Sequence, residues 1–250
     1  MNRKPTIILN LRRQWLAQDA GGHNQWQAEV TQRTLPADKL ALILCDVWDH
    51  HWSREAEERE AALIPQMNRV LAALRHHGAQ IIHAPSETMD FYHDHPARKR
   101  MLAISPIEPP ADLPHDTPSL PVDASDHGSD TGEATTHKAW CCQHPDIVID
   151  DARDLISDNG REIYSYLQQQ QIEQVLIMGV HTNMCILNRS FAIKQMVRWG
   201  VDIALIRDLT DTMYNPAMPP YVNHDEGTRL VVEFIEKFWC PSILSADLLA

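Results

Sequence analysis

The sequence predicts a doubly wound α/β fold, with three α/β/α layers built around a mostly parallel sheet of about six strands. Short runs that are apolar on both faces, such as LALILC at 40–45, are typical of buried parallel strands. These runs alternate with segments of helical period. Repeated strand–helix units with short joints form parallel sheets that helices cover on both faces.

The elements are expected to follow an N-terminal arm at 1–36, which shows no clear period and is interpreted as wrapping the domain or a neighbouring subunit. A single domain then spans 37–250, with a long loop insertion at about 96–145. Pro65 is expected near the start of the first helix, and Gly78 at its end. The predicted strands are 40–45, 79–84, 146–149, 174–179, 201–206 and 242–244; the predicted helices are 161–170, about 183–199, and a last one through 230–238.

Composition limits the classes of partner. Acidic residues outnumber basic ones by 34 to 22, and the net charge of -12 argues against binding to nucleic acid or to an anionic membrane. The five cysteines suggest no disulfide framework, and neither a signal peptide nor a membrane span is evident. We therefore expect a cytoplasmic protein that acts on a small molecule.

The strongest chemical signal is the sequence GVHTNMC at 179–185, between a predicted strand and a predicted helix. It places Cys185 in the first turn of a helix, where unpaired N–H groups and the helix dipole favour a thiolate. The same N–H groups are suited to hold an oxyanion. A small buried structural cysteine is an equally good interpretation of this residue alone.

Asp46 directly follows the first predicted strand of the domain, in LILCDVWDHHW. A carboxylate at this position either caps the next segment or faces the ligand crevice at the carboxyl ends of the strands. Beside Cys185 it would accept the thiol proton, especially if burial raises its pKa.

With these motifs and with IALIRDLTD, the chain from about Leu40 to Asp211 resembles the isochorismatase-like (cysteine hydrolase) superfamily, which includes nicotinamidases and N-carbamoylsarcosine amidases. The resemblance implies that Asp46 is the base and Cys185 the nucleophile. It also implies a cis peptide bond between Val180 and His181, and an oxyanion hole made by the backbone N–H groups of His181 and Cys185.

The chain departs from the family pattern at the lysine that normally follows the third strand and completes an Asp–Lys–Cys triad. Here the predicted strand is followed by Asp150, Asp151, Ala152 and Arg153, so Arg153 is the nearest candidate cation. Arginine stabilises a thiolate or an anionic substrate, but it is too basic to transfer protons.

Several other residues are candidates for substrate binding or a metal site. In the resembling proteins an aromatic residue five positions after the aspartate lines the pocket; the equivalent here is His51, and Trp48 and His224 are further candidates, although a solvated loop explains His51 as well. The sequence contains no glycine-rich phosphate-binding loop, so no nucleotide cofactor is expected. No metal is expected, because the Asp-x-His ligand spacing of the nicotinamidases cannot be recovered in this sequence. The potential metal ligands considered are His83, Glu87, Asp90, His93 and His95, and, in an acidic loop, Asp123, Asp126 and Asp130.

The leading hypothesis is a cofactor-independent hydrolase that cleaves an amide or carbamoyl C–N bond through a Cys185 acyl-enzyme. Two alternatives stay open: a non-catalytic ligand-binding member of the fold, and a hydrolase of an isochorismate-type vinyl ether. By the same resemblance, the chain is expected to form a homo-oligomer.

Overall fold

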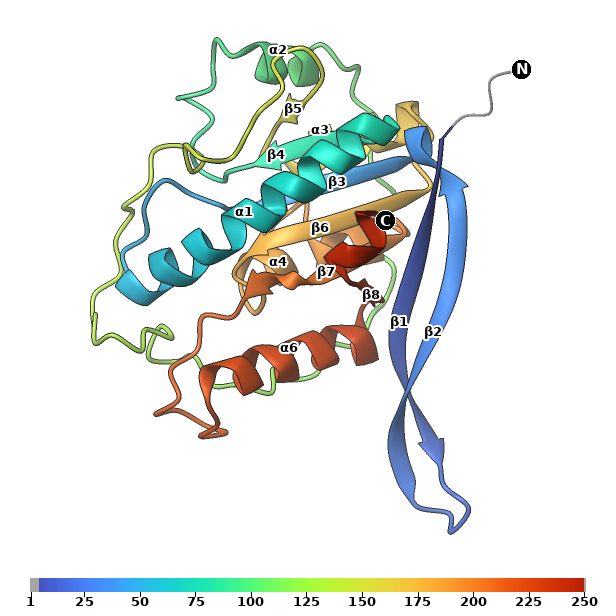
Figure 1. Ribbon diagram of the computed structural model, residues 1–250, viewed down its shortest axis with the longest axis vertical. Helices are drawn as coiled ribbons and strands as arrows, with labels where there is room; N and C mark the ends of the chain where they lie inside the picture. The colour runs from blue at the N-terminus through green and yellow to red at the C-terminus, as the bar shows by residue number, and fades with distance from the viewer. Residues whose placement is uncertain (1–4, 250) are drawn as a thin grey trace.

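The computed structural model describes residues 5–249 and shows one eight-stranded sheet flanked by helices (Figure 1). The strands are β1 (Thr6–Gln18), β2 (Asn24–Pro36), β3 (Leu40–Cys45), β4 (Gln80–Ala84), β5 (Leu155–Ile156), β6 (Gln174–Val180), β7 (Ile203–Asp211) and β8 (Ser242–Ile243). The helices are α1 (Arg54–His77), α2 (Pro96–Leu102), α3 (Gly160–Gln169), α4 (Cys185–Asn188), α5 (Ile193–Arg198) and α6 (His224–Phe238), with 3-10 turns η1 (Ala37–Lys39) and η2 (Ser245–Leu248).

The predicted fold class is confirmed. The strand order is β2-β1-β8-β7-β6-β3-β4-β5, and every pair from β8 to β5 is parallel. The chain builds outward from β3 in one direction through β4 and β5, then returns to β6 and builds the other way. The reversal lies between β3 and β6, and in sheets of this kind the ligand crevice lies outside the carboxyl ends of the strands at such a reversal.

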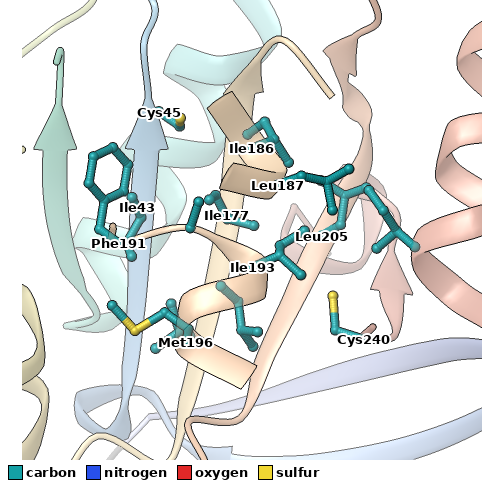
Figure 2. Close-up of a cluster of buried hydrophobic side chains, with 14 of the residues drawn as sticks. Ile43, Cys45, Ile177, Ile186, Leu187, Phe191, Ile193, Met196, Leu205 and Cys240 are labelled. Atoms are coloured by element: carbon teal, nitrogen blue, oxygen red, sulfur yellow. The ribbon is translucent and has the colours of Figure 1, made fainter. Parts of the chain in front are cut away.

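The core has two halves, one on each face of the sheet. On one face, apolar residues of α1 and η2 pack against β3, β6 and β7. On the other face, α3, α4, α5 and α6 pack against the same strands. Figure 2 shows this second half, with Ile186 and Leu187 of α4 and Ile193 of α5 beside Ile177 and Leu205 of the sheet. Both faces of the central strands are therefore buried, which is why their sequences are apolar without alternation.

Three predicted elements are wrong in type or extent. Residues 146–149 form no strand; β5 is only Leu155–Ile156, further along the same apolar-acidic stretch. The helix expected over 183–199 is two short helices, because Arg189 has an extended backbone that ends α4. Pro65 lies inside α1 rather than near its start; it faces solvent, so water can satisfy the carbonyl that loses its partner.

The N-terminal arm is regular, contrary to expectation. β1 and β2 pair along their full length as an antiparallel hairpin that crosses the amino-terminal ends of the central strands (Figure 1). The hairpin joins the sheet through a single pair, Arg12 with Ser242 of β8. It accounts for the difference between the six strands expected and the eight observed.

Candidate active site

Asp46 lies at the carboxyl end of β3, fully buried, with a backbone φ of 50° in the left-handed region. This conformation is uncommon for aspartate and turns the chain sharply after the strand. The carboxylate is held from two sides: the backbone N–H of Ser86 donates to Oδ1 at 2.8 Å, and Arg189 Nε lies 2.8 Å from Oδ2. Asp46 is thus fixed at the crevice where the sequence places it.

Cys185 is brought beside Asp46 by the turn that follows β6. Gly179 permits the close approach of β6 to β3, since a Cβ there would lie 2.0 Å from the carbonyl oxygen of Cys45. The Val180–His181 peptide bond is cis, as the family resemblance implied. The turn is then held by Asn183, whose side chain bonds both the N–H and the carbonyl of Met213.

Cys185 is the first residue of α4, and its thiol is near enough to Asp46 for each group to shift the pKa of the other. The backbone of His181 lowers the pKa of the thiol. A backbone donor expected for the oxyanion hole therefore lies near the sulfur. This arrangement suits a group that attacks a carbonyl while an adjacent N–H receives the developing charge.

The electrostatics of the site favour a neutral thiol at rest. Burial raises the pKa of Cys185 well above that of an ordinary thiol, and the Asp46 charge raises it further, while Arg189 acts against both. Burial also raises the pKa of Asp46, although Arg189 and the hydrogen bonds from Cys185 and Ser86 oppose this. The pair is therefore arranged for the proton to leave sulfur for the carboxylate only as the sulfur attacks.

Arg189 is the cation of this site, and sequence analysis missed it. Its Nε pairs with Asp46, its Nη1 lies 3.2 Å from Glu87 Oε1, and its guanidinium sits 5.8 Å from the Trp48 ring centre. The guanidinium also lowers the pKa of Cys185. The sequence signal that could have identified Arg189 is its position four residues after Cys185, which is about one helical turn. The helix ends at Arg189, and this break turns the side chain toward β3.

Arg153, proposed from sequence as the triad cation, does not reach the site. Its Nη1 donates to the carbonyl of Arg75 at 2.9 Å, near the end of α1. That helix ends just before β4 begins, so Arg153 lies at the amino-terminal edge of the sheet, opposite Asp46 and Cys185. The assignment failed because the strand expected at 146–149 is absent, which placed the lysine-equivalent position too early in the chain.

A wall of aromatic side chains adjoins the candidate site. Trp48 stacks on Trp140, with ring centres 4.0 Å apart and planes 8° from parallel. His51 lies 6.2 Å from Trp140 and 5.1 Å from the ring of His181. Trp140 comes from the second half of the segment 105–154, which has no helix or strand among the described residues. The long insertion thus supplies one side of the wall, and the loop after β3 supplies the other.

His181 faces this wall with a neutral ring. Burial, together with the nearby His51, lowers its pKa to about 3. Its Nε2 is buried and has no hydrogen-bond partner within residues 5–249. Burial also lowers the pKa of His51. Two uncharged imidazoles along this wall are able to donate or accept a hydrogen bond without adding charge.

His224 occupies a different position from that expected of a free substrate ligand. Its Nε2 lies 2.9 Å from Asp211 Oδ1, and its Nδ1 lies 3.1 Å from the carbonyl of Tyr214. Burial opposes a charged ring, but the bond to Asp211 outweighs it and raises the pKa of His224. With both nitrogens engaged, His224 braces the end of β7 against the start of α6.

The residues considered for a metal do not converge. His83 is fully buried, with Nδ1 bonded to Gln143 and Nε2 to Asp154. Glu87 pairs with Arg189, and His95 caps α2 by accepting from the N–H of Ala97. In the acidic loop, the carboxylates satisfy turn N–H groups or pair with side chains elsewhere. The metal-capable group found within the described chain is instead Asp49, Cys141 and Cys142, where one Asp49 oxygen lies 2.9 Å from the Cys141 sulfur.

One hollow on the surface lies away from Cys185. It is an open groove of about 590 Å³ between α1 and α6, lined by both acidic and basic side chains. It reaches Asp211 at the end of β7 but includes neither Asp46 nor Cys185. We locate the candidate site by the thiol, carboxylate and guanidinium that lie together at the strand reversal, because the groove is lined by no cysteine. No described helix has the length and apolar character needed to cross a membrane.

Comparison with known proteins places the chain in a family. The model of the isochorismatase domain matches residues 40–217, while no curated protein sequence matches. Among solved structures, an isochorismatase from Pseudomonas putida KT2440 is 11% identical with a TM-score of 0.50, over 85% of this chain and 91% of that one. A cysteine hydrolase from Pseudomonas syringae pv. phaseolicola 1448A is 15% identical with a TM-score of 0.47, over 86% and 92%.

The Pseudomonas putida structure supports the fold of this chain, and the match to the isochorismatase domain model supports its membership of that family. The matched range begins at the first residue of β3 and runs beyond β7, so it contains Asp46, Cys185 and the reversal between β3 and β6. It covers more than two thirds of the 250 residues. The chain belongs to the isochorismatase family.

Proposed function

We propose that this protein is a cysteine hydrolase that cleaves an amide or carbamoyl C–N bond of a small molecule, with Cys185 as nucleophile and Asp46 as base. Membership of the isochorismatase family supports a hydrolase. The single observation that carries the finer proposal is the contact of one buried carboxylate, Asp46, with both the Cys185 thiol and the Arg189 guanidinium.

The first half of the reaction forms a thioester. Asp46 takes the thiol proton while the sulfur of Cys185 attacks the carbonyl carbon, and the N–H groups of His181 and Cys185 receive the negative oxygen. The tetrahedral intermediate then collapses: the C–N bond breaks, and the proton held by Asp46 goes to the leaving nitrogen. Ammonia or an amine departs, and the acyl group stays on sulfur.

The second half returns the enzyme to its starting state. Asp46, again a carboxylate, removes a proton from water as the water oxygen attacks the thioester. The C–S bond breaks, the sulfur regains a proton from Asp46, and a carboxylic or carbamic acid leaves. Arg189 transfers no proton in either half, because a guanidinium is protonated at all accessible pH values. Its role is to stabilise the thiolate and to keep Asp46 ionised between proton transfers.

The test is a panel of small primary amides, ureas and carbamoyl compounds, with release of ammonia as the readout and intact-mass spectrometry to detect an acyl adduct. We expect turnover by the native protein, an adduct on the peptide that contains Cys185, and neither in Cys185→Ser or Cys185→Ala. Cys240→Ser is the matched control, since Cys240 is a buried cysteine outside the site. Turnover that survives in Cys185→Ala would refute the acyl-enzyme and favour a thiol-independent route such as vinyl ether hydrolysis.

A further inference from the structure

The N-terminal hairpin extends past the body of the domain (Figure 1). Its root is tied down: Asn10 bonds Asp247, Gln14 bonds Glu236, and Arg33 bonds Gln174. Nearer the tip, the body contacts are those of Trp26, whose ring packs edge-on against Phe238 at 5.6 Å and lies 5.3 Å from the Lys237 ammonium. A two-stranded ribbon standing free in water is marginally stable at best, so this half of the arm needs a further surface to pack against.

The composition of the free half is that of a buried contact. Between residues 14 and 28, Asp19 is the only Asp, Glu, Lys or Arg, in a chain of which 22% is charged. The exposed apolar side chains are large: Trp15 is 50% exposed, Leu16 52% and Val30 59%. Depletion of charge together with exposed tryptophan is the composition found at the centre of protein interfaces.

These apolar side chains lie on both faces of the ribbon. Cross-strand partners share a face, so Leu16 with Trp26, and Val30 with Arg12, lie on one side, while Trp15 with Gln27 lies on the other. The outer edge of β2 also lacks a strand partner in the described chain, because β2 ends the sheet order. A partner must therefore cover two faces and satisfy an edge, which a single flat surface does not do.

We propose that the hairpin is the contact surface of a symmetric dimer, in which each copy of this chain gives its arm to the other and receives one in return. The area argues for this reciprocity. Beyond the root, each strand of the hairpin has about six residues; at about 3.4 Å per residue and about 4.8 Å per strand, this half presents roughly 200 Å² on each face and roughly 400 Å² on both. A stable dimer buries about 800 Å² on each partner, which one arm does not reach. In a reciprocal exchange each copy buries its own arm and the surface that receives the other arm, and the two together reach that area.

The position of the arm predicts what the dimer leaves free. The hairpin crosses the amino-terminal ends of the central strands (Figure 1), whereas Asp46 follows the carboxyl end of β3 and Cys185 begins α4 after the carboxyl end of β6. Exchange of arms thus leaves the catalytic group open to substrate. The proposal is independent of the proposed reaction, and its test needs no substrate.

The experiment measures the molar mass of the full chain by light scattering across a dilution series. We expect a dimer for the native protein, and at least a tenfold weaker dimer for the combined variant Trp15→Gln, Leu16→Gln, Val30→Thr. The matched control is Phe91→Gln with Val148→Thr, which removes apolar side chains that are 63% and 57% exposed on the body. Circular dichroism of the arm variant guards against misfolding.

A second measurement maps the contact directly. Trp15→benzoylphenylalanine places a photo-crosslinker on the arm, and mixing heavy-isotope and ordinary copies before irradiation shows which chain it reaches. Crosslinks between copies support the proposal. A native protein that stays monomeric, a dimer that the arm variant does not weaken, or crosslinks confined to one copy would each overturn it, as would a monomer whose arm binds anionic lipid vesicles instead.

Discussion

Replacing Arg189 with glutamine tests whether this residue sets the reactivity of Cys185, and the test needs no knowledge of the substrate. The guanidinium pairs with Asp46 and lowers the pKa of the thiol, so its removal disfavours the thiolate. Alkylation by iodoacetamide proceeds through the thiolate. At any pH below the thiol pKa, the rate at Cys185 should therefore fall in Arg189→Gln in proportion to the lost stabilisation.

The size of the effect follows from the geometry. The thiol and the guanidinium both contact Asp46, and two unit charges roughly 6 Å apart interact by about 3 kcal/mol at an effective dielectric constant of about 20. The Arg189 side chain is 28% exposed, so solvent screens part of this, and about half remains, roughly 1.4 kcal/mol. That energy corresponds to about a tenfold slower alkylation of Cys185.

The assay quantifies alkylated peptides by mass spectrometry over time at several pH values. The exposed Cys141 provides an internal control, because its rate should not change. Arg189→Lys should keep part of the rate, since it retains the charge but loses the Nε contact. Arg153→Gln should behave as the native protein, because Arg153 lies at the other end of the sheet. An unchanged Cys185 rate in Arg189→Gln, or a slower one in Arg153→Gln, would refute the assignment of the cation.

Three further outcomes are expected. Cys185→Ser should reduce amide turnover by at least about 10³-fold while leaving the unfolding midpoint unchanged; turnover close to the native rate would remove the nucleophile assignment. Asp154→Asn should cost about 2–4 kcal/mol of unfolding free energy at neutral pH, measured with urea, because Asp154 is buried against Arg75 and His83. Burial raises the pKa of Asp154, but its two partners outweigh burial and lower the pKa overall. The stabilisation from the ionised Asp154 is therefore complete above about pH 4 and should be lost as the pH falls through the lowered pKa. An Asp154→Asn variant that loses the same unfolding free energy at pH 3 as at pH 7 would contradict this. Trp140→Ala should lower stability by about 1 kcal/mol or more and speed hydrogen exchange in 130–143, because Trp140 stacks on Trp48; unchanged exchange would show that the stack does not hold the segment.

The parts of the fold that sequence predicts well are those where burial is complete. β3 and β6 are apolar at nearly every position because helices cover both faces of them, and the observed bounds agree with the predicted ones to within a residue. The positions of Asp46 and Cys185 follow from these strands, since each residue stands at a fixed offset from a strand end. Their proximity then follows from the sheet order, in which β3 and β6 are neighbours.

The parts that sequence predicts poorly depend on contacts distant in the chain. IVID at 147–150 has the composition of a strand, yet Val148 is 57% exposed and its N–H bonds the side chain of Asn68 on α1. The hairpin was missed for a related reason: beyond the buried residues Ile7, Leu9 and Leu35 at its root, its strands are largely exposed and show no sustained apolar alternation. The period and composition of apolar residues reflect which side chains are buried, so a strand or helix without a buried face is hard to predict from sequence.

The triad lysine shows how a missing motif residue can mislead. The sequence lacks a lysine after the third strand, and this suggested altered or lost chemistry. The structure brings a cation to Asp46 from a different element, Arg189 at the end of α4. An arginine there supplies charge but no transferable proton, so every proton transfer of the proposed hydrolytic cycle falls to Asp46. Burial raises the pKa of that carboxyl and so makes it a stronger base, while Arg189 keeps it ionised; the two effects together give one aspartate the means to serve as base and then as acid.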